Sequence, residues 1–219
     1  MDIFDIIGPV MVGPSSSHTA GVVRIGNVAR RILGDTAGDI KVMFHGSLAD
    51  TYKGHGSDRA VIAGMLGFAA DDARIRNSLE LAEEEGVSFS FQKVKLDDVH
   101  PNTLIIHAEK NGKTVDVVGH SIGGGNILIS NINGIEVEFT GKYDTLVINH
   151  NDAPGVIASV TKMLADENIN IANMKVYRAQ KGGSAIMVID TDDRLSRSLG
   201  AKARVIENVE GATVIEGIY

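Results

Sequence analysis

The final part of the chain, about 75 residues long, alternates strand-like and helix-like patterns in an order that few folds accept. Strands are predicted where apolar or β-branched residues run between turn signals, and helices where apolar residues recur every three or four positions. In chain order the predicted segments are a strand at 146–148, a helix at 156–164, strands at 171–177 and 185–190, a helix at 195–206 capped by Asp192 or Asp193, and a strand at 213–215. This βαββαβ order is typical of the split βαβ arrangement of ferredoxin-like folds.

The middle of the chain is rich in predicted strands. Residues 87–94 alternate in polarity, and two pairs of short strand patterns flank Asn-Gly dipeptides, which are strong hairpin signals. The first pair, 103–108 and 114–118, surrounds Asn111-Gly112, and the second pair, 127–130 and 135–139, surrounds Asn133-Gly134.

The N-terminal part mixes both patterns. Residues 1–11 read as a strand or an edge segment, residues 17–33 as a helix preceded by a capping Ser and ended by Gly34, and residues 40–44 as a strand. A second helix is predicted from Ser57 to about Ala70. We therefore predict an α+β protein with a mixed α/β domain at 1–142, a joint near Gly141-Lys142, and a ferredoxin-like domain at 145–219.

Composition excludes several classes of protein. The 219 residues include no cysteine, so the chain itself cannot form disulfides, zinc-thiolate sites or iron–sulfur ligation. A net charge of −7 without a basic run argues against nucleic acid as a partner. No apolar run approaches the roughly 18 residues that span a bilayer, and the start lacks the basic region of a signal peptide. We expect a cytoplasmic protein without a membrane partner.

Three hydroxyls and an imidazole occur in a row at the start of the first predicted helix. Unpaired backbone N–H groups and the helix dipole favour a carboxylate or phosphate there, and Ser15, Ser16, Ser17 and Thr19 add donors. His18 could act as an acid or base on a neighbouring atom of the bound anion. A single Ser would be read as a helix cap, but the whole cluster exceeds what a cap requires.

A second imidazole, His55, lies between Gly54 and Gly56, which leave room for a close approach of substrate or backbone. Ser57 and Asp58 then repeat the polar helix start, and Asp58 could orient His55 or His18. The alternative is a glycine-rich turn with a surface His and an Asp that complements the helix dipole.

A third polar segment runs from Ser121 through three glycines, including Gly123 and Gly124, to Asn126. It lacks the lysine of a phosphate-binding loop and reads either as a ligand contact or as a tight connection. The nucleophile elbow Gly-x-Ser-x-Gly is absent, which disfavours a serine hydrolase.

The remaining histidines lack the spacing of metal ligands, and most are expected to be ordinary surface or sheet-face residues. They are His45, His100, His107, His120 and His150.

The loop before the helix at 156–164 has the sequence Asn151-Asp152-Ala153-Pro154-Gly155-Val156. Its Pro-Gly turn would expose backbone N–H groups beside two polar side chains, which suits the amino and carboxylate groups of a small amino acid. A simple strand-to-helix turn is the alternative.

Taken together, these motifs resemble the β subunit of the iron–sulfur-dependent bacterial L-serine dehydratases. The segments Pro14–Thr19, Gly54–Asp58 and Ser121–Gly125 are similar to that family's two N-terminal motifs and its glycine loop. Residues 145–219 resemble an ACT domain, with Asp152–Val156 at its ligand loop.

The resemblance implies deamination of L-serine to pyruvate and ammonia by α,β-elimination. It implies a [4Fe–4S] cluster ligated by a cysteine-bearing α subunit, and an N-terminal domain like the allosteric substrate-binding domain of phosphoglycerate dehydrogenases. On this basis His18 or His55 is the candidate base or leaving-group acid. The candidate substrate-binding residues are Ser15, Ser16, Ser17, Thr19, Ser57, Asp58, Ser121, Gly123 and Gly124.

The same resemblance implies an amino-acid effector, with serine as the natural choice, at Asn151–Val156, and a homodimer paired through ACT domains. Two rival classes remain: a non-catalytic amino-acid-binding regulatory protein, and an anion-binding scaffold without an enzyme attached.

Overall fold

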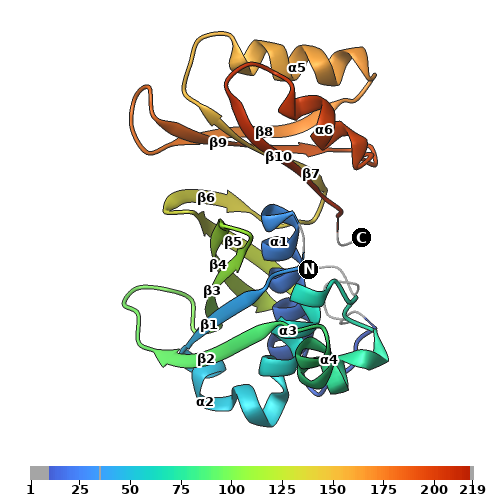
Figure 1. Cartoon of the computed structure of the whole chain (residues 1–219), viewed down its shortest axis with the longest axis vertical. Coiled ribbons are helices and arrows are strands. Elements are labelled where there is room, and N and C mark those ends of the chain that lie inside the picture. Colours follow the sequence, from blue (N-terminus) through green and yellow to red (C-terminus); the bar gives the residue numbers. More distant parts are fainter. Residues whose placement is uncertain (1–9, 35, 218–219) are drawn as a thin grey trace. The chain divides into compact units, whose positions relative to one another are not determined.

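The structure is a computed structural model that describes residues 10–34 and 36–217. The predicted strand at 1–11 therefore lies almost entirely outside the described residues. The chain divides into two compact units, Met1–Gly134 and Ile135–Tyr219 (Figure 1). The division falls before the predicted joint, so the strand after Asn133-Gly134 groups with the second unit.

The first unit is built on a twisted sheet in the order β2-β1-β3-β4-β5. Strands β1 and β2 are parallel, with Val42 opposite Phe91, whereas β1–β3, β3–β4 and β4–β5 are antiparallel. The strand bounds are β1 Asp39–His45, β2 Ser88–Val94, β3 Thr103–Lys110, β4 Lys113–Gly123 and β5 Asn126–Ile132. Both Asn-Gly turns have the positive φ angles that their sequences predict.

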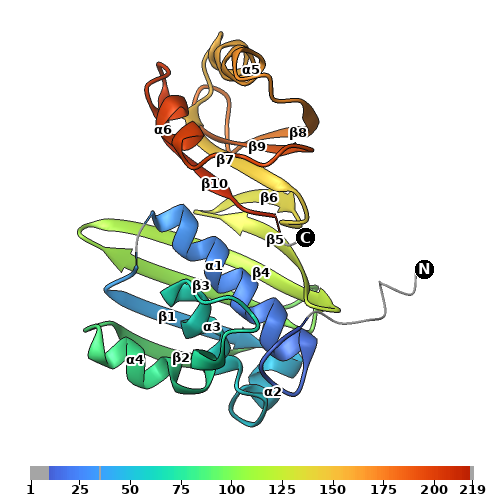
Figure 2. The same ribbon diagram turned by 90° about the vertical axis from the view of Figure 1, so that its right-hand side faces the viewer.

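Helices cover one face of this sheet (Figure 2), and α1 lies across β3, β4 and β5. The apolar stripe of α1 is buried against the sheet and α3, as its spacing predicts. The helix bounds are η2 Ser16–Ala20, α1 Gly21–Leu33, α2 Gly46–His55, α3 Ser57–Leu66, η3 Ala73–Asn77 and α4 Ser78–Glu84.

Helices α1 and α3 cross closely because each carries a glycine at the crossing point. A Cβ atom on Gly26 would lie 2.6 Å from the carbonyl oxygen of Val61, and one on Gly64 would clash with the carbonyl oxygen of Val23. No side chain larger than hydrogen therefore fits between the two backbones.

One predicted boundary in this unit is corrected. Helix α3 ends at Leu66 rather than near Ala70, because Gly67 adopts a left-handed φ of 88° and caps it. Helix α2 and the η3–α4 segment were not predicted. Only Leu48 and Ala49 are buried in α2, so its sequence carries little helical periodicity.

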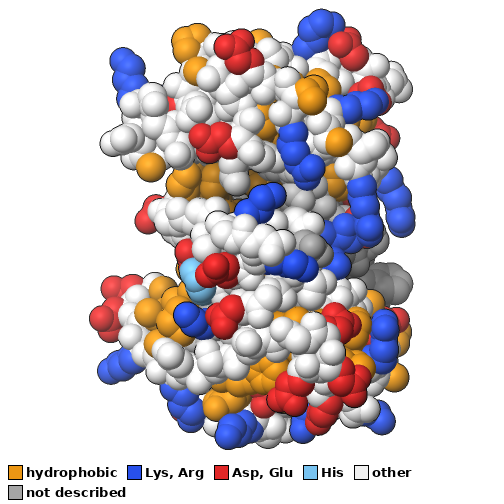
Figure 3. Space-filling view, in the orientation of Figure 1, with side chains coloured by type: hydrophobic (Ala, Val, Ile, Leu, Met, Phe, Trp, Pro, Cys, Tyr) orange, Lys and Arg blue, Asp and Glu red, His pale blue; other side chains and the backbone are white. Residues whose placement is uncertain are grey.

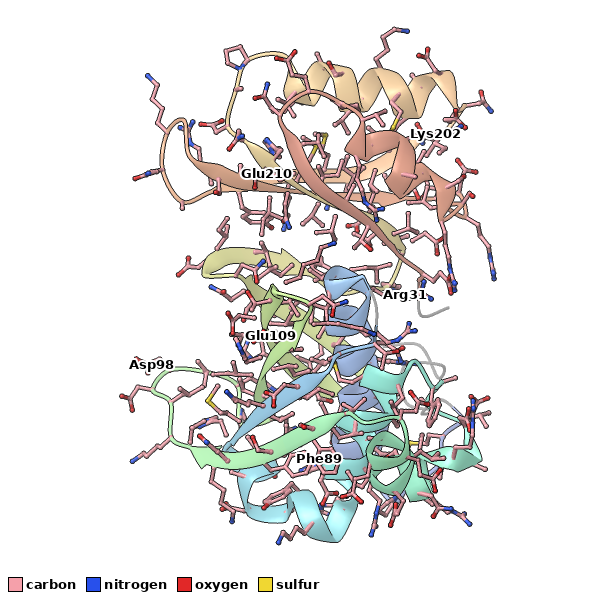
Figure 4. All side chains as sticks on the ribbon, viewed as in Figure 1. Arg31, Phe89, Asp98, Glu109, Lys202 and Glu210 are labelled. Carbon is pink, nitrogen blue, oxygen red and sulfur yellow. The ribbon has the colours of Figure 1, made fainter. Side chains whose placement is uncertain are left out.

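Helix α2 is anchored to the sheet by an aromatic cluster. The Tyr52 ring stacks on Phe44 with centroids 5.0 Å apart and lies 6.2 Å from Phe91. Phe89 continues the cluster along β2, 5.7 Å from Phe91, and its place beside α2 is marked in Figure 4.

The second unit has the predicted ferredoxin-like core, an antiparallel sheet in the order β10-β7-β9-β8. Leu146 and Ile148 of β7 pack with Val160 and Leu164 of α5 in its hydrophobic core. The bounds are β6 Ile135–Phe139, β7 Asp144–Asn151, α5 Val156–Asp166, β8 Ile171–Arg178, β9 Ser184–Thr191, α6 Ser198–Arg204 and β10 Val209–Ile215.

Helix α6 is shorter than predicted, and its cap was assigned to the wrong residue. Arg197, not Asp192 or Asp193, occupies the N-cap position. Both aspartate side chains instead accept hydrogen bonds from Asn170, whose amide side chain lies 3.4 Å from Asp192 and whose backbone N–H lies 3.3 Å from Asp193.

On the face shown in Figure 3, acidic and basic side chains are interspersed over both units. Within residues 10–34 and 36–217, no helix is long and apolar enough to cross a membrane.

Candidate functional site

The polar cluster begins with a π-helical turn that runs into α1. Ser15 is the N-cap, as predicted for a Ser at this point, and its hydroxyl oxygen accepts a hydrogen bond from the His18 amide at 3.3 Å. The Gly21 amide donates to the carbonyl of Ser16, five residues back, which widens this turn.

The His18 imidazole is 9% exposed and touches a serine hydroxyl on each side. Its Nδ1 lies 3.2 Å from the hydroxyl oxygens of both Ser15 and Ser17, and its Nε2 lies 3.1 Å from that of Ser47 on α2. Burial, followed by the nearby ring of His55, lowers the pKa of His18, and a hydrogen bond with the Ser47 backbone partly opposes this. The ring is therefore neutral at pH 7.

The second imidazole belongs to a helix end, not to an irregular glycine-rich turn. His55 is the last residue of α2, and Gly56 caps the helix with a left-handed φ of 72°. The rings of His55 and His18 lie 4.7 Å apart between centroids, with their planes tilted by 51°. Nδ1 of His55 is buried and has no hydrogen-bond partner among the described residues.

The hydroxyls of Ser57 and Thr19, which were predicted to bind substrate, contact backbone carbonyls within this cluster. Ser57, fully buried at the start of α3, donates to the carbonyl oxygen of His18 at 2.8 Å. Thr19 is buried against Gly13, and its hydroxyl lies 3.5 Å from the carbonyl oxygen of His55. Both hydroxyls thus join the backbones that carry the two imidazoles.

The side-chain hydrogen bond that the structure gives Asp58 is local. The carboxylate accepts a hydrogen bond from the Arg59 amide at 2.8 Å, and the His18 nitrogens are instead partnered by serines. Burial raises the pKa of Asp58.

The glycine loop approaches the same helix start. The hydroxyl of Ser121, in β4, lies where a Cβ atom on Gly21 would be, so Gly21 allows the helix to lie close to the strand. Beyond Ser121, Gly123 and Gly124 adopt positive φ angles of 101° and 60° in the β4–β5 turn. The carbonyl of Gly125 accepts a hydrogen bond from Arg24 of α1.

Asn102, which sequence reasoning missed, lies beside Ser121. The Asn102 side-chain amide nitrogen is 3.4 Å from the carbonyl oxygen of Ser121, and the two residues also share a backbone hydrogen bond. The amide oxygen of Asn102 and the hydroxyl of Ser121 are buried and lack a partner among the described residues.

Two of the other histidines, His120 in β4 and His150 in β7, are buried residues of the sheets. His120 hydrogen-bonds through its two ring nitrogens to the hydroxyls of Thr103 and Ser130, both at 2.7 Å. His150 is 2% exposed, and its Nδ1 donates to the Asn151 carbonyl at 2.8 Å.

No group of three or more His, Asp or Glu side chains that could hold a metal ion occurs in the described part of the chain, and the sequence contains no cysteine.

The loop Asn151–Val156 is pre-formed within the second unit. The Asp152 carboxylate accepts hydrogen bonds from the Arg178 guanidinium at 2.9 Å and the Gly182 amide at 3.0 Å. These contacts, the amide first, lower the pKa of Asp152. Gly155 has a φ of 92° and directs the chain into α5.

The comparisons with known proteins match both units. The family model of the serine dehydratase beta chain matches residues 1–131, and that of the ACT domain matches residues 145–205. A probable L-serine dehydratase beta chain of Bacillus subtilis is 42% identical, and an L-serine dehydratase beta chain of Peptoniphilus asaccharolyticus is 40% identical. Each alignment covers 97% of this chain and 97% of the relative.

A more distant relative is a D-3-phosphoglycerate dehydrogenase of Bacillus subtilis, which is 26% identical over 88% of this chain and 37% of its own length. The long matches to the two beta chains, together with the family model, decide the assignment: this chain belongs to the serine dehydratase beta chain family and ends in an ACT domain.

Proposed function

We propose that this chain is the β subunit of an L-serine ammonia-lyase, which converts L-serine to pyruvate and ammonia together with an α subunit. The full-length similarity to L-serine dehydratase beta chains supports the reaction, and the word "beta" in their names supports a second chain. We assign the [4Fe–4S] cluster to cysteines of that α subunit, where its iron would act as a Lewis acid on the substrate hydroxyl.

In this proposal the chain supplies the groups that bind the substrate and move its protons. The carboxylate of L-serine would lie at the start of α1, where Ser15, Ser16 and Ser17 add hydroxyl donors to a helix terminus. Asp58, Ser121, Gly123 and Gly124 stay predicted contributors to this site. Ser57 and Thr19 would act by holding the backbones of the two histidines.

We assign the removal of the Cα proton to His55. The observation that carries this choice is the unpartnered Nδ1 of His55, since both nitrogens of His18 are engaged by serine hydroxyls. His55 takes the Cα proton, the bond between Cβ and the hydroxyl oxygen breaks, and the imidazolium of His55 gives that proton to the departing hydroxyl. The hydroxyl leaves as water, and 2-aminoacrylate remains. The enamine tautomerises to the imine and hydrolyses to pyruvate and ammonia.

The test is pyruvate release from L-serine by the chain co-expressed with its partner under anaerobic conditions. His55→Gln is expected to lower kcat by 10²-fold or more, as for loss of a general base. His107→Gln is the matched control, since His107 lies on the sheet and pairs with Asp116 at 2.8 Å. A loss in His55→Gln below about tenfold would exclude His55 as the base.

The main alternative is a non-catalytic amino-acid-binding regulatory protein. The similarity to a D-3-phosphoglycerate dehydrogenase, which extends over both units, supports this alternative. It predicts that the partner makes pyruvate without this chain, with this chain altering only the response to an effector. The lyase proposal predicts that neither chain alone is active.

For the ACT domain we propose an amino-acid effector bound at Asn151–Val156, with serine as the first choice, and a homodimer that brings two such loops together. Isothermal titration of the full chain with L-serine tests the effector, and sedimentation equilibrium tests the dimer. Less heat at millimolar L-serine in Asp152→Ala than in the parent chain would assign that share of the binding to this loop, and equal heat in the two chains would exclude it.

A further inference from the structure

We propose that Ser47 is a positioning residue that holds His18 as the tautomer with its proton on Nε2 and its lone pair on Nδ1. Ser47 belongs to none of the polar motifs that the sequence displays, yet its hydroxyl oxygen lies 3.1 Å from Nε2 of His18. Only the catalytic consequence of this inference rests on the proposed function.

The hydrogen bonds around Nδ1 place the lone pair there. The hydroxyl oxygen of Ser15 already accepts the amide proton of His18 at 3.3 Å, so its own hydroxyl proton is free to point at Nδ1, 3.2 Å away. Ser17 offers a second hydroxyl at the same distance. Nδ1 has one lone pair, so one of the two hydroxyls donates to it, and the other can donate to its neighbour because the Ser15 and Ser17 oxygens lie 3.4 Å apart.

A neutral imidazole carries one ring proton, so an accepting Nδ1 leaves that proton on Nε2. The hydroxyl oxygen of Ser47 is then its side-chain acceptor, beside the hydrogen bond that the Ser47 backbone also makes to the ring. No carboxylate is needed for this role, which agrees with Asp58 being engaged by the Arg59 amide.

Ser47 is held rigidly enough to fix the ring. Its amide donates to the carbonyl of Pro101 at 2.9 Å, and Gly46 packs directly against the same residue. The hydroxyl of Thr51, one turn later, donates to the Ser47 carbonyl at 2.7 Å. Helix α2 therefore carries Ser47 in its first turn and His55 at its last residue, and touches His18 at both ends.

The tautomer has a chemical consequence at the serine cluster. The lone pair on Nδ1 is the one position where the neutral ring can gain a proton. Gaining it turns Nδ1 into a donor, and the hydroxyls of Ser15 and Ser17 can then direct their own protons to an incoming carboxylate. Ser47 thus acts on substrate binding through His18.

The first test uses the full-length chain alone, with ¹⁵N-labelled histidine, in long-range ¹H–¹⁵N spectra at pH 8. His18 is expected to show a protonated Nε2 and an unprotonated Nδ1. Ser47→Ala is expected to shift the ring toward a mixture of tautomers, and Ser47→Thr to restore the parent spectrum. Thr161→Val, which removes an exposed hydroxyl that bonds only within α5, is the control.

A protonated Nδ1 in the parent chain, or an unchanged spectrum in Ser47→Ala, would overturn the inference. If Ser47→Ala fails to fold, Ser47→Cys keeps the shape with a weaker acceptor, and the measurement on the parent chain needs no variant. This test is independent of whether the chain belongs to a lyase.

The second test uses the assembled enzyme. Ser47→Ala is expected to raise KM for L-serine about three- to tenfold, the range for one lost hydrogen bond, with kcat within about threefold of the parent. Ser47→Thr should restore KM. An equal fall in kcat with unchanged KM would contradict a role in substrate binding. Absence of any lyase activity would refute the proposed function and leave the tautomer result standing.

Discussion

The close crossing of α1 and α3 makes a quantitative prediction for Gly26→Ala. The added Cβ would lie 2.6 Å from the Val61 carbonyl oxygen, whereas ordinary contact begins at 3.4 Å, so the helices must separate by about 0.8 Å. All three of its nearest atoms are backbone atoms, so no side chain can turn away to relieve the contact. We expect an overpacking cost of about 1–3 kcal/mol.

Gly54→Ala is the matched control for this variant. Gly54 also lies inside a helix, but a Cβ there would have no atom within 4 Å. Alanine should therefore stabilise α2 by roughly 0.5–1 kcal/mol through helix propensity alone. Because both variants gain that propensity, the difference between them isolates the cost of the clash.

Native-state hydrogen exchange of the α1 amides reports the free energy of opening of the first unit directly. The opening free energies of Gly26→Ala and Gly54→Ala are expected to differ by about 1–3 kcal/mol. A difference below about 0.5 kcal/mol would show that the helices separate at almost no cost, and would refute the reasoning from the crossing.

Three further predictions concern individual side chains of the two units. Ser57→Ala removes the buried hydrogen bond to the His18 carbonyl and should lower the opening free energy of α1 by about 1 kcal/mol, measured by the same exchange. The pKa values of His18 and His120 are both lowered in the fold, chiefly by burial, so the unfolded chain takes up protons first as pH falls below about 6.5. The free energy of unfolding should thus be level above that pH and fall below it, and His120→Gln should flatten the fall in urea titrations. Asp152→Asn weakens the contact with the Gly182 amide, and that amide should then exchange faster by NMR.

The parts of the fold that sequence predicted well are those with strong local signals. The βαββαβ order of the second unit and the two Asn-Gly turns follow from residue patterns that need no distant partner. The cap of α6 was assigned wrongly because Asp192 and Asp193 find a competing partner, Asn170, at the start of β8.

The site was predicted only in part, for a related reason. Ser15–Thr19 and His55 stand out as polar residues beside glycines, whereas Ser47 and Asn102 are single polar residues with no local pattern. Their contacts with His18 and Ser121 form only when β1, β3 and β4 are paired and α2 is in place, so no local pattern reveals them. The burial of His120 likewise depends on hydroxyls from two neighbouring strands.

The π-helical turn at Ser16–Ala20 has a consequence for the length of this segment. A π turn holds one residue more than an α-helical turn, and deletion of one residue there would restore an ordinary helix. The residues on the N-terminal side would then rotate by about 100° around the helix axis relative to α1. Deletion of one serine from the run Ser15–Ser17 would therefore shift the remaining serine hydroxyls around the helix axis. The contacts between the Ser15 hydroxyl and His18 would then be lost.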